Sequence, residues 1–351
     1  MPRDDRFDLL TFALLPDVGP RRLRELRVRG TIAEALAAPQ QHADLLGAEG
    51  VRRLRSGEAR RRAELEARKA AQLGIELVGY DDANYPAYLR EIYDPPPVLY
   101  VRGALDAGEG ERSVAIVGAR AAHPAGLALA RALGRDLAAA GATVVSGLAR
   151  GIDTEAHRGA LLAEGRTVAV VGAGLDCIYP KENASLALQI AERGGLVSEL
   201  PLGTGPAPHN FPRRNRIIAG WVCGVVVVEA AIKSGSLITA RLALESGRDV
   251  MAVPGHPSSL GSAGTNALIR DGARLVRDAQ DVALELGFDL VGRAETEAFG
   301  VLSAMQVDKP ATLEEIAASS GRAPAELLSE LLELELQRKV RRLPGALYVR
   351  N

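Results

Sequence analysis

The middle of the chain alternates between short apolar runs and longer stretches with helical periodicity. The runs lack the polar alternation of half-exposed strands, which is typical of strands buried on both faces. Helical stretches at 125–140, 154–163 and 237–246 separate several of them. This alternation predicts an α/β domain with a Rossmann-like, doubly wound, mostly parallel sheet. The runs lie at 75–78, 98–101, 114–117, 143–146, 168–171, 196–198, 225–228 and 250–253.

The N-terminal residues 1–72 are rich in Ala and Arg and have helical periodicity throughout, which predicts a small helical domain, similar to SAM or helix–hairpin–helix modules. Within it, residues 15–22 (Leu-Pro-Asp-Val-Gly-Pro-Arg-Arg) are similar to a helix–hairpin–helix turn. Gly19 would permit a tight turn and bring amides and arginines near a phosphate. A purely structural module is favoured, and a DNA-contacting module is the alternative.

The C-terminal residues 299–351 predict a winged-helix-like domain, joined by a linker at 289–298 to the sheet domain at 73–288. Thr312 and Glu315 form a capping box before one helix, a second helix covers 325–337, and 341–349 has the pattern of a hairpin wing. The second helix is acidic and would repel a duplex backbone. Protein contact or a degenerate role is therefore favoured over duplex binding.

Composition restricts how this protein could hold a charged partner. It has 351 residues, with 43 Lys and Arg against 44 Asp and Glu, so any affinity for nucleic acid must come from local clusters. Cys177 and Cys223 lie in apolar contexts and form no metal-binding pair, which predicts buried, reduced thiols and no metal site. Neither a signal pattern nor a membrane-spanning run is present, so we expect a cytoplasmic protein without membrane contact.

Four loops that follow apolar runs carry unusual side chains, at the edge of the sheet where ligands bind in open α/β folds. The first continues as Gly118-Ala-Arg120, which would hold an arginine over the crevice. A dinucleotide fingerprint is absent, because no G-x-G-x-x-G follows the run. The alternative is a surface arginine after a tight turn, without a ligand.

The second loop has the sequence Ser-Gly-Leu-Ala-Arg-Gly-Ile-Asp at 146–153. Its amides at Ser146, Gly147 and Gly151 could surround an anionic oxygen, with Arg150 beside them. Asp153 is a candidate N-cap, which would instead give the loop a structural role.

The third loop places three arginines, two asparagines and one aromatic ring in the seven residues 210–216. Arginines are permanently charged donors for phosphates, and Phe211 could stack on a base, with Trp221 as a second candidate. A solvated charge run is the alternative, but the interleaved Asn and Phe disfavour it. This cluster is the strongest signal that the residues themselves give.

The fourth loop, Lys233-Ser234-Gly235-Ser236, comes after a buried run and opens a helix. Lysine, hydroxyls and free amides would face an anion at the positive end of that helix. A serine cap with a solvated lysine is the alternative. The upstream glycines of a P-loop are missing, so triphosphate hydrolysis is not indicated.

Catalytic machinery is not evident in the sequence. The histidines are scattered, and no H-E-x-x-H motif, nucleophile elbow or carboxylate pair occurs. Phosphate-facing loops without a nucleophile or base predict binding rather than catalysis. We therefore expect no catalytic residues and no cofactor.

The motifs, in their order, resemble the DNA processing protein A family (DprA, also called Smf). They lie at 117–120 (Val-Gly-Ala-Arg), 146–153, 174–180 (Gly-Leu-Asp-Cys-Ile-Tyr-Pro), 211–218 (Phe-Pro-Arg-Arg-Asn-Arg-Ile-Ile), 227–236 and 254–266 (Pro-Gly to Gly-Thr-Asn). The resemblance implies a homodimeric protein that binds single-stranded DNA and helps to load the RecA recombinase in natural transformation. The segment 219–224, with Trp221, departs from the family's usual sequence.

The expected nucleic-acid-binding residues come from these loops and from the resemblance. They are Gly118, Arg120, Ser146, Gly147, Arg150, Gly151, Asn210, Phe211, Arg213, Arg214, Asn215, Arg216, Lys233, Ser234, Gly235 and Ser236.

Two other functions compete with this one. The first is a hydrolase similar to the nucleoside-monophosphate phosphoribohydrolases, but the comparable loop at 233–239 lacks their catalytic Glu. The second is a duplex-reading regulator that would use the winged helix, and it predicts that DNA binding disappears without residues 295–351.

Overall fold

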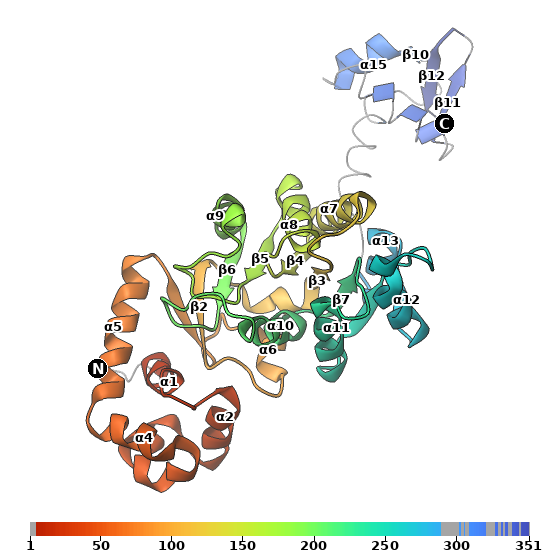
Figure 1. The fold of residues 1–351 in the computed structure, drawn as a ribbon. Coiled ribbons are helices and arrows are strands. Elements are labelled where there is room, and N and C mark those ends of the chain that lie inside the picture. Colours follow the sequence, from red (N-terminus) through yellow and green to blue (C-terminus); the bar gives the residue numbers. More distant parts are fainter. Residues whose placement is uncertain are drawn as a thin grey trace. The chain divides into compact units, whose positions relative to one another are not determined.

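The protein consists of two compact units, Met1–Asp289 and Leu290–Asn351 (Figure 1). The computed structural model describes residues 5–288, 302, 305, 309–320, 327–328, 331–332, 334–335, 339–343 and 345–350. The N-terminal helices share the first unit with the sheet, so a domain boundary near residue 73 stays a prediction. The predicted linker 289–298 lies outside the described residues.

A nine-stranded sheet forms the centre of the first unit, in the order β1-β2-β6-β5-β4-β3-β7-β8-β9. From β6 to β9 neighbouring strands are parallel, while β2 runs antiparallel to both β1 and β6. The predicted α/β class with a mostly parallel sheet is confirmed. The strands are β1 (Glu76–Gly79), β2 (Val98–Gly103), β3 (Ser113–Val117), β4 (Thr143–Ser146), β5 (Thr167–Val170), β6 (Gly195–Ser198), β7 (Gly224–Val227), β8 (Asp249–Ala252) and β9 (Arg274–Leu275).

Helices cover both faces of this sheet, as Figure 1 shows. One face carries α6 (Ala87–Glu91), α10 (Asn210–Trp221) and α11 (Gly235–Glu245). The other carries α7 (Pro124–Ala139), α8 (Ile152–Leu162), α9 (Ala184–Arg193) and α13 (Ala279–Leu286), and α12 (Ala263–Arg270) packs at β8.

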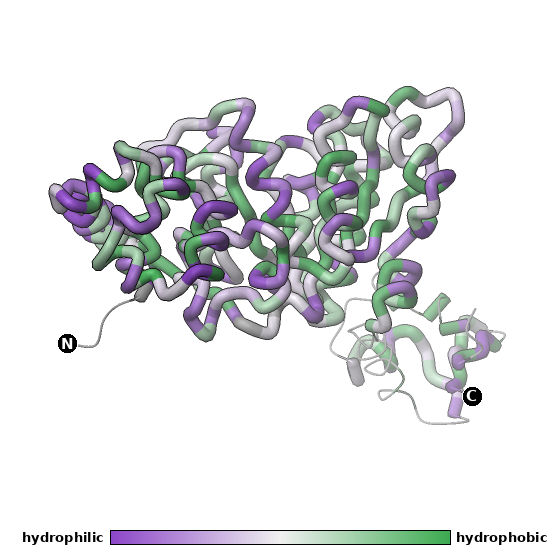
Figure 2. Tube along the Cα trace, turned by 90° about the horizontal axis from the view of Figure 1, so that it is seen from below, coloured by the Kyte–Doolittle hydropathy of each residue, from purple (hydrophilic) through white to green (hydrophobic). Residues whose placement is uncertain are grey.

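Burial on both faces explains why the strands are so uniformly apolar. In β5, Val168 and Val170 belong to the core under α10, while Ala169 belongs to the core under α9. Successive residues of a strand point to opposite faces, so both faces need apolar side chains. Figure 2 shows the hydrophobic segments running through the interior of this unit.

The strand order creates a crevice at one place on the sheet edge. The chain runs outward from β3 to β6, then returns to place β7 against the other side of β3. At such a switch point the loops that follow the two central strands leave toward opposite faces, and ligands bind there. The loops after β3 and β7 are thus brought together.

The N-terminal helices have a core of their own and also pack on the sheet unit. They are α1 (Asp5–Ala13), α2 (Pro20–Arg29), α3 (Ile32–Ala37), α4 (Ala43–Arg55) and α5 (Glu58–Gln72). Phe12, Leu23 and Leu46 fill the first core, while Leu9 and Leu10 join the core under α9. The turn after α1 differs from the expectation, because Asp17 takes the left-handed conformation (φ 60°) and Gly19 has an ordinary φ of −87°.

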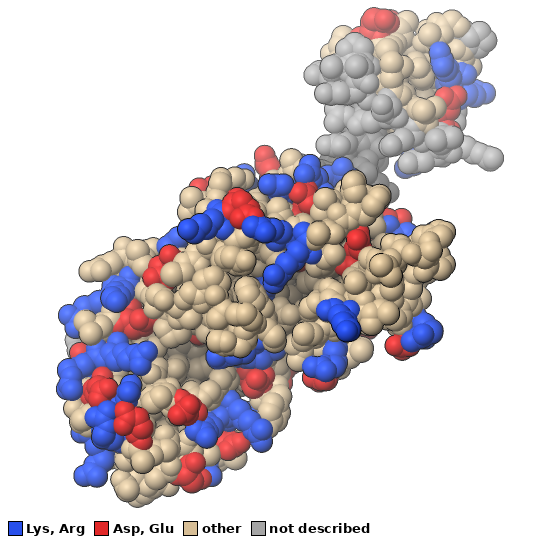
Figure 3. All heavy atoms as spheres, in the orientation of Figure 1, with Lys and Arg blue, Asp and Glu red and all other residues tan. Residues whose placement is uncertain are grey.

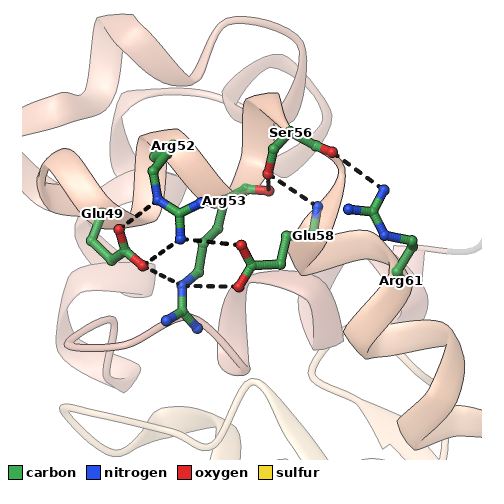
Figure 4. A network of polar contacts seen from close by, with 6 residues as sticks. All are labelled: Glu49, Arg52, Arg53, Ser56, Glu58 and Arg61. Atoms are coloured by element: carbon green, nitrogen blue, oxygen red, sulfur yellow. Dashed lines mark hydrogen bonds and ion pairs between the residues drawn. The ribbon is translucent and has the colours of Figure 1, made fainter.

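Several arginines of these helices have acidic partners within the same module, and Figure 4 shows this for Arg52 and Arg53. Glu49 accepts hydrogen bonds from Arg52 and Arg53, each at 2.7 Å, and Glu58 lies 3.1 Å from Arg52. The hydrogen bonds to Arg52 and Arg53 lower the pKa of Glu49 to about 2. On the face of these helices that Figure 3 shows, basic and acidic side chains are interspersed, which favours the structural role over a basic DNA-binding face there.

The second unit contains a small three-stranded sheet in the order β10-β12-β11 and the helix α15 (Leu313–Ser320). The predicted capping box is confirmed, with Thr312 and Glu315 exchanging hydrogen bonds of 2.8 and 3.2 Å. The predicted wing is the antiparallel pair β11 (Val340–Leu343) and β12 (Leu347–Arg350). The predicted helix 325–337 falls partly outside the described residues, and those described between 327 and 335 are helical. β10 is the strand Ala311–Thr312.

Candidate nucleic-acid interface

A cleft of about 240 Å³ opens at the switch point, between the loop after β3 and the first turns of α10 and α11. A smaller hollow of about 40 Å³ continues from it toward the loop after β4. The two share Arg120, Ala149, Phe211 and Arg214. Of the predicted residues, those that line one or both are Gly118, Arg120, Gly147, Arg150, Phe211, Arg214, Asn215, Ser234, Gly235 and Ser236.

The loop after β3 supplies an exposed arginine. Gly118 is needed there because a Cβ atom would lie 2.6 Å from Ile152 and 3.0 Å from the Glu229 carbonyl. Arg120 is exposed, and its guanidinium stands 5.1 Å from the centre of the Phe211 ring. None of the ion pairs within the described ranges involves Arg120. Its charge is therefore available to a ligand.

The loop after β4 is occupied by its own side chain rather than open to an anion. Asp153 is not the N-cap of α8, a position that Gly151 holds (φ 76°). Its buried carboxylate instead accepts hydrogen bonds from the amides of Gly147 at 3.1 Å and Ala149 at 3.4 Å. Of the predicted amides, that of Gly147 is therefore already bound to a carboxylate of the same loop.

Two other residues of this loop also have partners inside the protein. The Ser146 hydroxyl is fully buried and donates to the Ile116 carbonyl at 2.6 Å, which directs it away from the cleft. Arg150 lines the smaller hollow and is paired with Glu182. The pair is exposed, so Arg150 can exchange Glu182 for another anion at little cost.

Arg214 is the buried cation of the site. Its Nη1 donates to the Val170 carbonyl at 2.6 Å, while Nε is buried without a hydrogen-bond partner in the described structure. Burial is the main cause that lowers the pKa of Arg214, to about 10, which still leaves it charged at neutral pH. Gly147 makes room for it, because a Cβ there would lie 1.7 Å from Nη1. An anion in the cleft would meet a poorly solvated guanidinium.

The predicted cluster 210–216 forms the start of α10, and the helix divides its side chains among different directions. Phe211 and Asn215 join Arg214 in the cleft. Arg216 instead forms a nearly buried ion pair with Glu199 and donates to the Asp94 carbonyl at 2.6 Å. The structure thus does not bring Arg216 to the cleft. Three other residues of this helix that the sequence suggested for the site also lie outside it.

Those three are placed as follows. Arg213 is half-exposed and lies 3.7 Å from Glu199. Asn210 is buried, with its amide 3.4 Å from the Gly205 carbonyl. Trp221 is completely buried in the core, so it cannot stack on a base, contrary to the expectation from the sequence.

The start of α11 forms the opposite wall of the cleft. Ser234 is the N-cap, and its hydroxyl lies 2.8 Å from that of Ser236. Gly235 faces open space, because a Cβ added there would have no neighbouring atom within 4 Å, so a ligand backbone can approach. Lys233 is exposed just outside the residues that line the cleft. The positive end of this helix adds to the charge of Arg120 and Arg214.

Sequence reasoning missed one residue of the site and one residue that fixes the helix beside it. Tyr179 lines the smaller hollow, with its ring centre 6.1 Å from that of Phe211, and it lies in the Gly-Leu-Asp-Cys-Ile-Tyr-Pro motif that gave a usable signal. Glu199 follows β6 and fixes Arg216, which no local pattern reveals. Both cysteines are free and half-buried rather than fully buried.

Neither a metal cluster nor a membrane span occurs among the described residues. No group of three or more His, Cys, Asp or Glu side chains in the described part of the chain could hold a metal ion. Among the described helices, none combines the length and apolar character of a membrane span.

Comparison with known proteins decides the family. Residues 76–287 match the family described as "DNA recombination-mediator protein A", and residues 294–346 match the "DprA winged helix domain". The chain belongs to this DNA recombination-mediator family. It is a family of mediators rather than of enzymes, and its members include the DNA processing proteins that the motifs resemble.

Individual relatives cover most of the chain. The "Protein Smf" of Escherichia coli is 41% identical over 289 residues, which are 78% of this chain and 77% of that protein. The X-ray structure of DNA processing protein A (DprA) from Streptococcus pneumoniae matches with a TM-score of 0.68 and 34% identity, over 82% of this chain and 99% of that one. DNA processing protein A from Helicobacter pylori, whose structure is described in terms of its single-stranded DNA binding mode, matches with a TM-score of 0.55 and 30% identity, over 61% and 97%.

Proposed function

We propose that the cleft at the switch point binds the phosphate backbone of single-stranded DNA. The observation that carries this proposal is that the exposed Arg120, the buried Arg214 and the start of α11 all line the same cleft. An always-charged guanidinium and a positive helix end both favour phosphate oxygens. The single-stranded DNA binding of the Helicobacter pylori relative supports the same ligand.

The aromatic side chains support a single strand over a duplex. Phe211 carries Arg120 on its ring and has Tyr179 beside it, and Tyr179 is 41% exposed. Unpaired bases stack on such rings, whereas the bases of a duplex are already stacked on one another. The DNA-contacting set then contains Gly118, Arg120, Gly147, Arg150, Phe211, Arg214, Asn215, Ser234, Gly235 and Ser236, with Lys233 at the margin.

The wider role follows from the family. We propose that the protein works in the cytoplasm as a homodimer, holds incoming single strands during natural transformation and passes them to the RecA recombinase. Membership of a recombination-mediator family supports a recombinase as partner.

The salt dependence of binding tests the proposal. For single strands, the logarithm of the affinity falls with the logarithm of salt concentration by about 0.7 per neutralised phosphate. Arg120→Ala should weaken binding of a fluorescein-labelled oligo(dT) and flatten this slope by about 0.7, because one phosphate contact is lost. Fluorescence anisotropy at several salt concentrations measures both quantities.

Arg241→Ala is the matched control, because Arg241 is an exposed arginine of α11 that pairs with Glu245 and lies outside the residues lining the cleft. It should leave affinity and slope unchanged. An Arg120→Ala slope equal to that of wild type would show that the cleft does not hold the phosphates.

A further inference from the structure

A second, larger hollow of about 400 Å³ opens beside the cleft, at the carboxyl ends of β7 and β8 and the start of α7. Its volume is in the range of small-molecule sites. It shares none of its lining residues with the cleft. They are His123, Ala125, Gly126, Leu129, Val228, Glu229, Val253, Pro254, Gly255, His256, Ser259 and Ser262.

The same two loops build both openings. The loop after β3 gives Arg120 to the cleft and His123 to the second pocket, and these Cα atoms, three residues apart, lie within about 11 Å. The loop after β7 gives Ser234 to the cleft and Glu229 to the pocket. Both openings are therefore bordered by the same two loops at this edge of the sheet, so a strand that crosses these loops would contact both.

The chemistry of the second pocket differs from that of the cleft. Its lining residues include no Lys or Arg and do include the Glu229 carboxylate, which would repel a phosphate group. Leu129, Val228 and Pro254 give apolar surface, and His123, Glu229 and His256 give polar groups. A mainly apolar concavity with a few convergent polar groups suits a planar, uncharged ligand with hydrogen-bonding edges.

Glu229 is the acceptor that this pocket presents. Its carboxylate accepts a hydrogen bond from the His123 amide at 3.0 Å, which fixes its position. Gly126 and Gly261 leave space for it, because a Cβ at either position would lie 2.6 or 2.7 Å from a carboxylate oxygen. No ion pair in the described residues neutralises it, so lone pairs remain for an N–H donor.

The Pro-Gly to Gly-Thr-Asn motif, which the cleft does not use, shapes the opposite wall. Asn266 exchanges two hydrogen bonds with the backbone of Gly255, at 3.1 and 3.0 Å. A Cβ on Gly255 would lie 2.0 Å from the Ser262 hydroxyl, so only glycine permits this close packing. The wall that holds Ser262 and His256 is thus fixed by the motif.

We propose that this pocket receives a nucleobase with an exocyclic amino group, which donates to the Glu229 carboxylate. The inference rests on the proposed function, because the base would belong to the strand whose phosphates occupy the cleft. Carboxylates pair with the amino group of cytosine in this way, and adenine carries a comparable amino group. Thymine has none, so the pocket distinguishes bases that the backbone cleft treats alike.

The test compares the affinities of oligo(dC) and oligo(dT) of equal length. Wild type should bind oligo(dC) about fivefold more tightly than oligo(dT), or more, because one additional hydrogen bond to a charged acceptor stabilises the complex by at least that factor. In Glu229→Gln the ratio should fall toward one, because the amide oxygen still accepts from His123 while the amide NH₂ group faces the amino group of the base. Glu245→Gln, on an exposed acid of α11, is the matched control and should keep the wild-type ratio.

Ala125→Leu is a second variant that tests whether this pocket causes the base preference. Ala125 is an exposed residue of the first turn of α7 that lines the pocket, so a larger side chain there narrows the pocket without disturbing the core. It should also lower the ratio. A ratio that stays at the wild-type value in both variants overturns the inference, as does a wild-type ratio of one.

The two proposals fail in different ways. If oligo(dT) does not bind at all, or binds with the same salt slope in wild type and Arg120→Ala, the proposed function fails. If oligo(dT) binding depends on Arg120 but the base preference does not depend on Glu229, only the base pocket fails.

Discussion

Arg214 and Arg216 are two residues apart, yet they do different work. Arg214 lines the cleft and keeps one buried N–H without a partner in the described structure, while Arg216 is paired with Glu199. An α-helix turns by about 100° per residue, so neighbours in a run of arginines face different directions. The sequence predicted a cationic cluster at 210–216, but it could not divide that cluster, because the partner Glu199 comes from another element.

A buried histidine leads to a prediction about pH. Thr167 donates its hydroxyl hydrogen to the Val144 carbonyl, so the His157 Nδ1 must donate to Thr167, at 2.7 Å. The His157 Nε2 is buried without a partner in the described structure, and burial lowers the pKa of His157 from 6.5 to about 3. The unfolded chain therefore binds one proton more than the folded chain between these pH values. The free energy of unfolding should fall as pH drops from about 6.5 toward 3, by up to about 1.4 kcal/mol per pH unit from this group.

His157→Asn isolates the effect, since asparagine keeps a donor near the Nδ1 position and does not titrate. Urea unfolding at pH 7, 6 and 5 should show a shallower loss of stability in the variant than in wild type. Equal slopes would mean that His157 takes up its proton as readily in the folded protein as in the unfolded one.

At the scale of elements, the hydrophobic pattern predicted the strands well because burial on both faces leaves a continuous apolar signature. All eight predicted runs overlap a strand of the sheet. β9 was missed, since Arg274 and Leu275 are both exposed and form no apolar run. The antiparallel direction of β2 could not be predicted from the sequence either, because the direction of a strand depends on its partners and not on its own side chains.

The ion pair that holds α10 gives a prediction at this scale. The Arg216 and Glu199 side chains are only 10% and 5% exposed. Arg216→Met should lower the free energy of unfolding by about 3 kcal/mol, because it leaves the buried Glu199 carboxylate with only the more distant Arg213, 3.7 Å away. The double variant Arg216→Met, Glu199→Leu should regain most of that stability, as chemical denaturation can measure.

A DNA-binding measurement distinguishes this structural role of Arg216 from a direct contact with DNA. Where Arg216→Met remains folded, its salt slope for oligo(dT) should equal that of wild type. A flatter slope in the double variant would place Arg216 among the phosphate contacts instead.

At the scale of the whole molecule, the sequence predicted the order of the parts but not how they associate. The helices of residues 1–72 look like a separate domain because their periodicity is distinct, yet Leu9 and Leu10 are buried in a core that the sheet shares. The winged-helix-like unit was recognisable because capping and turn signals are local. Contacts between distant segments leave no comparable trace in a single sequence.

Removing the second unit tests which part binds DNA. Residues 1–289 form a compact unit that contains the entire cleft, so a protein ending there should fold and bind oligo(dT) with an unchanged salt slope. Competition between single strands and duplex, with the full-length and the shortened protein, measures this. Loss of single-strand binding on truncation would instead assign the DNA contact to the winged-helix domain.

The pairing of β3 with β7 also has a consequence during synthesis of the protein. The two strands begin about 110 residues apart, and β7 covers an edge of β3 that stays open until it arrives. At roughly 5 to 20 residues per second, a ribosome needs about 5 to 20 s to make that stretch. An unpaired apolar strand edge can pair with the wrong strand. Until β7 emerges, the open edge of β3 is therefore the segment of the nascent chain that a chaperone would bind.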